Sequence, residues 1–156
     1  MGTPGRASKG KAATAQRRQP ATAAPAPAEG PSLKSARQRW LRGNSEEARA
    51  QYEALANNPA QKSAAVVGIS RTWQSLGDYD KALAVVDAAL TELSKDADLL
   101  ARRAELLHFR GRWPEAEQAA AGALAVSPDH FLARWVRAIT WRDRGETKKA
   151  DAEFRW

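Results

Sequence analysis

A glycine recurs every 34 residues along most of this chain, and that interval constrains the fold more than any other feature. The four glycines are Gly43, Gly77, Gly111 and Gly145. Five residues after each comes an alanine, at Ala48, Ala82, Ala116 and Ala150. Seven residues before each comes a small residue, at Ala36, Ser70, Ala104 and Ala138. Three columns that agree across four units without an insertion predict one supersecondary motif repeated four times.

The motif itself is predicted to be a pair of helices. Apolar residues recur at three- and four-residue spacing from Ser32 onward, which is typical of amphipathic helices. A glycine can take a positive φ and end a helix, and small residues let two antiparallel helices approach closely. We expect the helix pairs 33–42 with 45–57, 61–76 with 79–93, 97–110 with 114–126, and 129–144 with 147–156. The units are then 32–60, 61–96, 97–128 and 129–156, the last one truncated. Asp78 and Thr147 are the expected caps of two of the second helices.

The N-terminal segment has a different composition. Residues 1–31 are rich in alanine and proline and contain no Val, Ile, Leu, Phe, Trp or Tyr. Such a segment cannot bury enough apolar surface to offset the entropy lost on ordering, so we expect a disordered basic leader. Residues 1–32 carry five basic residues and one acid, which is +4 of the net charge of +7. The basic charge therefore does not predict a specific nucleic-acid partner, although a weak electrostatic contact through the leader stays open.

Several classes of site are not indicated by the sequence. The chain contains no cysteine, and no apolar run approaches the length of a membrane span. It has no P-loop, dinucleotide-binding glycine motif or HExxH sequence. The two histidines, His108 and His130, lack metal-ligand spacing, and His130 fits a helix cap better than a catalytic group. We therefore predict a cytoplasmic protein that is not an enzyme and has no catalytic residue, metal or cofactor.

The repeat resembles the tetratricopeptide repeat, whose unit is a helix-turn-helix of 34 residues. The segment GDYDKAL in the second unit is similar to the family consensus, and Pro128 closes the third unit as a family member would. The first unit departs from the pattern, because Arg39 stands where Trp73, Leu107 and Trp141 stand in the others. The resemblance implies an all-α right-handed superhelix, or α-solenoid, of about 3.5–4 repeats. It also implies that the first helices line a concave groove that binds a partner peptide or helix.

The groove residues follow from their spacing before each turn glycine. Family members that hold acidic peptide tails use an asparagine and Lys/Arg clamp. The matching column reads Arg37, Arg71, Glu105 and Ile139, so that activity is not implied here. The remaining groove is mixed, with basic and aromatic positions. The candidate partner-binding residues are Arg71, Gln74, Arg102, Glu105, His108, Phe109, Trp135, Ile139 and Arg142.

The tryptophans divide into two groups. Trp73 and Trp141 lie four residues before a turn glycine, on the predicted core face. Trp40 and Trp135 fall on the groove-facing phase, where a large aromatic residue either anchors a partner or packs on a neighbouring helix. The chain ends in an amphipathic half-helix with Phe154 and Trp156, which leaves self-association through this helix open.

These observations favour a non-catalytic scaffold for protein–protein interaction, with a protein or peptide as partner. Two alternatives stay open. In one, the repeats are the N-terminal region of a larger multidomain bacterial protein, whether or not an enzyme. In the other, the chain is an adaptor whose basic leader contacts nucleic acid weakly.

Overall fold

The computed structural model describes residues 1–3 and 30–155, and within it residues 33–154 form helices joined by short turns. The expectations for the leader at 4–29 and for Trp156 lie outside the described residues. Two helices form each unit, and their bounds are α1 Leu33–Leu41, α2 Ser45–Ala56, α3 Lys62–Ser75, α4 Tyr79–Glu92, α5 Ala97–Phe109, α6 Trp113–Val126, α7 Phe131–Asp143 and α8 Thr147–Phe154. The all-α class predicted from the sequence is confirmed, and the described helices begin and end within about two residues of the predicted bounds.

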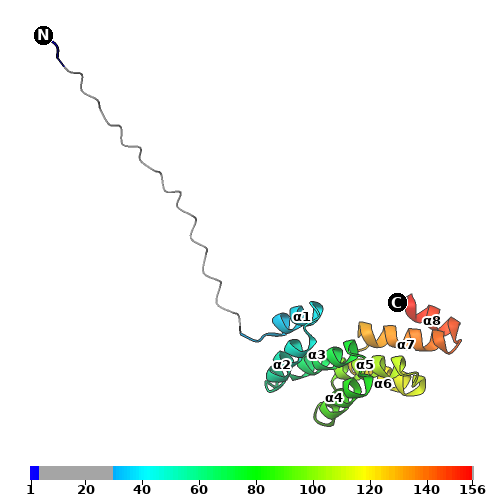
Figure 1. Cartoon of the computed structure of the whole chain (residues 1–156). Helices are drawn as coiled ribbons and strands as arrows, with labels where there is room; N and C mark the ends of the chain where they lie inside the picture. The colour runs from blue at the N-terminus through cyan, green and yellow to red at the C-terminus, as the bar shows by residue number, and fades with distance from the viewer. Residues whose placement is uncertain (4–29, 156) are drawn as a thin grey trace.

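The helices stack as a solenoid in which each unit contacts only its neighbours (Figure 1). Every first helix packs against the second helix of its own unit and against the first helix of the next, so α1 contacts α3, α3 contacts α5, and α5 contacts α7. Each second helix also packs against the first helix of the following unit. Because the first helices touch one another in series, they form one continuous face of the array.

The turn glycines end the first helix of every unit in the same way. All four have positive φ, between 71° and 87°. In the second unit the N–H of Gly77 donates to the carbonyl oxygen of Gln74, and the N–H of Asp78 donates to that of Trp73. These two bonds form a Schellman motif, and the other three glycines make the equivalent pair. The predicted role of the glycine column is therefore confirmed.

The two other columns lie at the contacts between helices. Seven of their eight members are alanines, and all eight side chains are at most 1% exposed. Around them lies an apolar core whose larger members include Val86, Leu99, Leu106, Leu107 and Val136. The small residues allow the two helices of a pair to approach closely, and the larger side chains fill the space between units.

Only some of the helix caps predicted from the sequence are present in the structure. Asp78 accepts a hydrogen bond from the N–H of Lys81 at 3.0 Å, as predicted. His130 precedes α7 as its N-cap and accepts through Nδ1 from the N–H of Ala133 at 3.3 Å, which confirms its predicted capping role. Thr147 is not a cap, because α8 begins at that residue and Glu146 precedes it without a side-chain capping bond. Within the described part of the chain, no helix is both long and apolar enough to cross a membrane.

Candidate functional site

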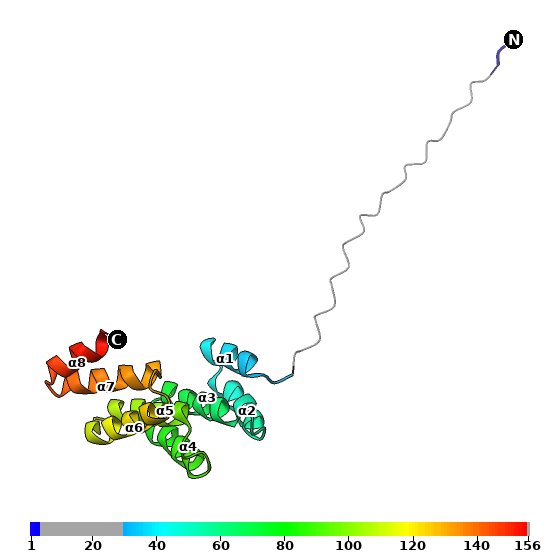
Figure 2. The ribbon, with the colours of Figure 1, turned by 180° about the vertical axis from the view of Figure 1, so that it is seen from behind.

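A hollow of about 510 Å³ lies on the face formed by the first helices. Val67 and Arg71 of α3, Asp98 of α5, and His130 and Phe131 at the start of α7 are among the residues that line it. Figures 1 and 2 show that α1 and α7 lie on the same side of α3 and α5, so the series of first helices is curved. The hollow lies on the inner side of this curve, because its lining comes from α3, α5 and the start of α7. The lining offers both apolar surface and charge to a ligand from outside the chain.

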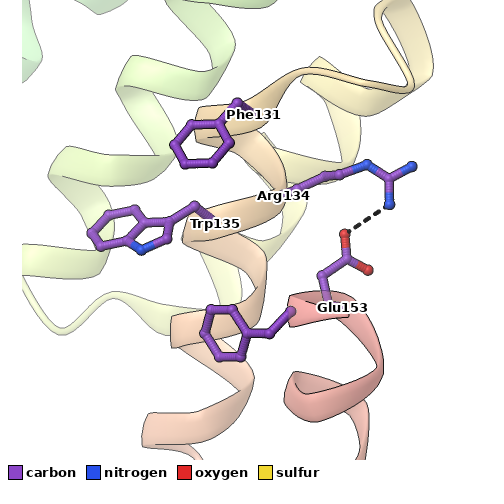
Figure 3. Close-up of a pocket in the computed structure, with 5 residues that line it drawn as sticks. Phe131, Arg134, Trp135 and Glu153 are labelled. Carbon is purple, nitrogen blue, oxygen red and sulfur yellow. Dashed lines mark hydrogen bonds and ion pairs between the residues drawn. The ribbon is translucent and has the colours of Figure 1, made fainter. Parts of the chain in front are cut away.

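Aromatic rings extend this face toward the C-terminal end. Phe131 is 73% exposed, and Trp135 is half-buried against the core. The two rings lie on one side of α7, whereas Arg134 turns to the other side and pairs with Glu153 of α8 at 3.3 Å (Figure 3). Together with Phe154 these residues line a second hollow of about 140 Å³. Trp135 therefore packs on the core and also lines this second hollow, and its role as a partner anchor stays a prediction.

Arg102, one of the predicted groove residues, lies inside the array and links α5 to α3. Its side chain is 1% exposed, and its Nε donates to Ser70 Oγ at 2.7 Å. One terminal nitrogen donates to Gln74 Oε1 at 2.6 Å, and the other pairs with Glu105. Burial lowers the pKa of Arg102, and the neighbouring carboxylate of Glu105 opposes that shift. Each of its three guanidinium nitrogens has one of these partners, so Arg102 bridges the first helices α3 and α5.

His108 makes the next bridge, between α5 and α7. It is 9% exposed, and its Nδ1 lies 3.0 Å from Thr140 Oγ1. Its Nε2 lies 3.5 Å from Asp143 Oδ2. Burial lowers the pKa of His108, while the charge of Asp143 opposes that effect. A second contact joins the same helices at their starts, where His130 Nε2 lies 3.0 Å from Asp98 Oδ1.

The other predicted residues differ in accessibility. Phe109 is 49% exposed, with its ring 5.7 Å from that of His108 and 6.2 Å from that of Tyr79. Ile139 is buried. Arg142 is exposed, and its Nε donates to Asp143 Oδ1 at 3.1 Å. The structure thus brings the nine predicted residues to one series of helices, with Arg71, Phe109, Trp135 and Arg142 reaching solvent.

Phe131 and Tyr52 are among the lining residues that did not enter the sequence prediction. Phe131 precedes Trp135 by four residues, which places both side chains on the same side of α7. This spacing was the sequence signal from which Phe131 could have been predicted. Tyr52 belongs to a second helix, and its ring lies against α3, where a Cβ on Gly68 would come within 2.4 Å of it. The signal for this contact was a glycine in the interior of a helix, which usually marks a close packing approach.

Among the described residues, no group of three or more histidine, aspartate or glutamate side chains is placed to hold a metal ion.

The stacked helix pairs define a helical repeat protein of the solenoid class. Residues 74–140 match the family model of the tetratricopeptide repeat. The resemblance drawn from the turn glycines and the small-residue columns is confirmed for this segment, and residues 74–140 carry tetratricopeptide repeats. No curated protein matches the chain by sequence.

Several solved structures share the fold. A tetratricopeptide repeat protein from Parabacteroides merdae superimposes with a TM-score of 0.61 at 20% identity, over 78% of this chain and 49% of that one. MamA from Desulfovibrio magneticus gives a TM-score of 0.61 at 13% identity, over 78% and 69%. The first repeat domain of Spaghetti (RPAP3), bound to the HSP90 peptide SRMEEVD, gives 0.61 at 13%, over 72% and 90%. The chain thus spans about half the length of the Parabacteroides protein, and these likenesses show the fold alone.

Proposed function

We propose that this chain is a protein–protein interaction scaffold that binds a peptide or helix of a partner protein along the face of α3, α5 and α7. The observation that carries this proposal is the 510 Å³ hollow, because it combines apolar lining at Val67 with charge at Arg71 and Asp98. A partner segment with an apolar residue for the hollow and polar residues at its rim fits such a surface.

The exposed aromatic side chain at the edge of the hollow supports the proposal. Phe131 presents a ring that the rest of the fold does not need for packing, since it is 73% exposed at the first position of α7. Aromatic residues next to a hollow are typical anchors of protein interfaces. A repeat domain of the same fold, that of Spaghetti (RPAP3), is bound to a peptide, which supports a ligand of this kind.

We assign the nine predicted residues two kinds of role. Arg71, Phe109, Trp135 and Arg142 reach solvent and are proposed to touch the partner. The others are proposed to fix the spacing of the first helices, through Arg102 with Gln74 and Glu105, through His108, and by apolar packing of Ile139. The proposed binding array comprises residues 32–156, in the four units predicted from the sequence.

The test is capture of partners by the immobilised full chain from a lysate of its source cells, compared between variants. Phe131→Glu places a charge at the edge of the hollow. We expect it to lower the recovery of the proteins bound by the wild-type chain by about tenfold or more. The readout is quantitative mass spectrometry of the recovered proteins, with helicity checked by circular dichroism.

Leu76→Glu is the matched control, because Leu76 is also an exposed apolar residue, at 55%, but lies at the turn that ends α3. It should recover the same proteins at wild-type levels. Recovery by Phe131→Glu at the level of the control would contradict the proposed binding face.

A further inference from the structure

One column of the repeat is buried in the first three units and exposed in the fourth. The position nine residues after each turn glycine holds Tyr52, Val86, Ala120 and Phe154. The first three side chains are at most 5% exposed, and in each of these units the next first helix packs on the second helix, α3 on α2, α5 on α4 and α7 on α6. Phe154 is 47% exposed, and among the described helices α8 packs only against α7. The face that receives the following first helix elsewhere in the array is therefore open on α8.

The groove between α7 and α8 is shaped to receive a helix. The equivalent groove between α5 and α6 holds α7, which packs on both of these helices. Between α7 and α8 the same place is a hollow of about 140 Å³, lined by the aromatic residues Phe131, Trp135 and Phe154 (Figure 3). Its acid, Glu153, is already paired with Arg134 at 3.3 Å. The groove thus offers mainly apolar surface to a ligand from outside the chain.

The interface between α2 and α3 shows what packs against a ring at this position. The ring of Tyr52 lies so close to Gly68 of α3 that an added Cβ would be 2.4 Å from it. Two units later the sizes are reversed, because Ala120 stands at the position of the tyrosine and Val136 at that of the glycine, and both lie in one core cluster. In the intervening unit the glycine position holds Arg102, whose guanidinium is bound by side chains of α3 and α5. A ring on the second helix therefore goes with a small residue on the next first helix.

We propose that the groove between α7 and α8 binds an amphipathic helix of another protein, with a glycine or alanine in its apolar stripe where the stripe meets Phe154. Phe154 takes the place that Tyr52 holds in the first unit, so a larger residue opposite it would collide with the ring. The helix α3 shows the remaining pattern, since Ala65 and Thr72 are buried on the same side as Gly68. The partner helix continues the repeating interface of the array, in the manner of a helix bound in an apolar groove.

Two segments of the chain itself do not match this pattern. The first helix of a second copy, α1, carries the exposed residues Lys34 and Gln38 at the positions of Gly68 and Thr72. It would bring a lysine against the ring where α3 has a glycine. Residues 1–31 contain no Val, Ile, Leu, Phe, Trp or Tyr, so they lack the side chains of an apolar stripe.

The test is a nuclear magnetic resonance titration of the ¹⁵N-labelled full chain with an acetylated and amidated peptide of residues 61–76, which carries the pattern of α3. We expect saturable shifts of the backbone amides of Glu153 and Phe154 at peptide concentrations up to about 1 mM. Phe154→Ala should weaken binding by about tenfold or more, because the apolar contact of the ring is lost. The matched control is Leu41→Ala, which removes an exposed apolar side chain at the end of α1 and should stay within about twofold of wild type.

The same peptide with Gly68→Val tests the proposed relationship of sizes. It should bind the wild-type chain about tenfold or more weakly, since the valine collides with the ring. It should bind Phe154→Ala more tightly than it binds the wild-type chain, because the valine then fills the space that the ring leaves. The glycine peptide should show the opposite order of affinities for the two proteins.

Four results would overturn the inference. The first is no saturable shift with about 1 mM peptide. The second is a set of shifts in α1 and α2 in place of α8, which would mean that the peptide replaces α3. The third is equal affinity of the glycine and valine peptides for the wild-type chain. The fourth is a dimer in analytical ultracentrifugation that Phe154→Ala abolishes, because a second copy would then cover this face.

The outcome is separable from that of the proposed function. Phe154 is not among the residues that line the larger hollow, whereas Phe131→Glu changes the edge of that hollow. Loss of peptide binding in Phe154→Ala together with wild-type recovery of partners from lysate would support the helix site as a second, independent contact.

Discussion

Arg102 of α5 donates through Nε to Ser70 Oγ of α3 at 2.7 Å, so the one serine in the column of small residues has a partner of its own. The corresponding positions in the other units are alanines. The hydroxyl of Ser70 in turn donates a hydrogen bond to the carbonyl oxygen of Val67 at 2.7 Å. A buried guanidinium with three partners on two helices fixes the spacing of adjacent units more sharply than apolar packing alone.

Removing the guanidinium should therefore destabilise the array. Arg102→Met keeps most of the apolar stem but leaves Ser70, Gln74 and the carboxylate of Glu105 without their partner. Since Glu105 keeps 17% of its side chain exposed and can be partly solvated, we expect a loss of about 2–4 kcal/mol in the free energy of unfolding. Urea unfolding followed by circular dichroism measures it.

The adjacent arginine provides the control. Arg103 pairs with Asp87 at 2.7 Å, but both side chains are partly exposed, so Arg103→Met should cost less than about 1 kcal/mol. Equal costs for the two substitutions would show that the Arg102 bridge is energetically unimportant.

Gly68 should not tolerate even a methyl group. An added Cβ would lie 2.4 Å from Cε1 of Tyr52, and the ring is held in the core of the first two units. Although Gly→Ala inside a helix is normally stabilising, here the collision should cost about 1–3 kcal/mol of unfolding free energy. Thermal and urea unfolding of Gly68→Ala test this.

A double-mutant cycle assigns that cost to the ring. In a Tyr52→Val background the nearest ring atoms are gone, so the added methyl should be neutral or stabilising. A cost that persists in this background would mean that the backbone of α3, and not the tyrosine, excludes the side chain.

The repeat columns could be predicted from the sequence because each of them serves a local geometric need. A positive φ favours glycine, and a close helix contact favours a small side chain, wherever the residue lies. The side-chain bridges were harder to predict. Arg71 and Arg102 both lie on first helices with similar surroundings in sequence, yet one reaches solvent and the other is enclosed by partners 28 and 32 residues away.

The contact between Tyr52 and Gly68 depends on a longer-range relationship. The ring comes from the second helix of one unit and crosses the first helix of the next, so a search of first-helix positions alone does not find it. Gly68 was the available signal, since a glycine inside a helix costs stability unless something packs against it.

Substitution by alanine should change the free energy of unfolding in opposite directions at a turn glycine and at a glycine inside a helix. Gly77 has φ of +80°, which an L-residue adopts only at a cost, so Gly77→Ala should lose about 1–2 kcal/mol. Gly122 lies within α6, and an added Cβ would meet only the methyl groups of Leu100 at 3.8 and 3.9 Å. Gly122→Ala should therefore gain about 0.5–1 kcal/mol. Urea unfolding compares them, and a shared sign would contradict the conformational argument.

The contact between α5 and α7 should weaken in mild acid. Burial lowers the pKa of His108 below its ordinary value of 6.5, so the unfolded chain takes up this proton at a higher pH than the folded chain does. Stability from this group is therefore fully present above about pH 6.5 and is lost as the pH falls toward the lower pKa of the folded state. The opposing charge of Asp143 limits the loss, and the nearby charges of Glu105 and Arg142 partly cancel. The free energy of unfolding, measured from pH 7.5 to 5, should fall for the wild-type chain and fall less for His108→Gln. Parallel curves for the two proteins would exclude His108 as the source of the acid sensitivity.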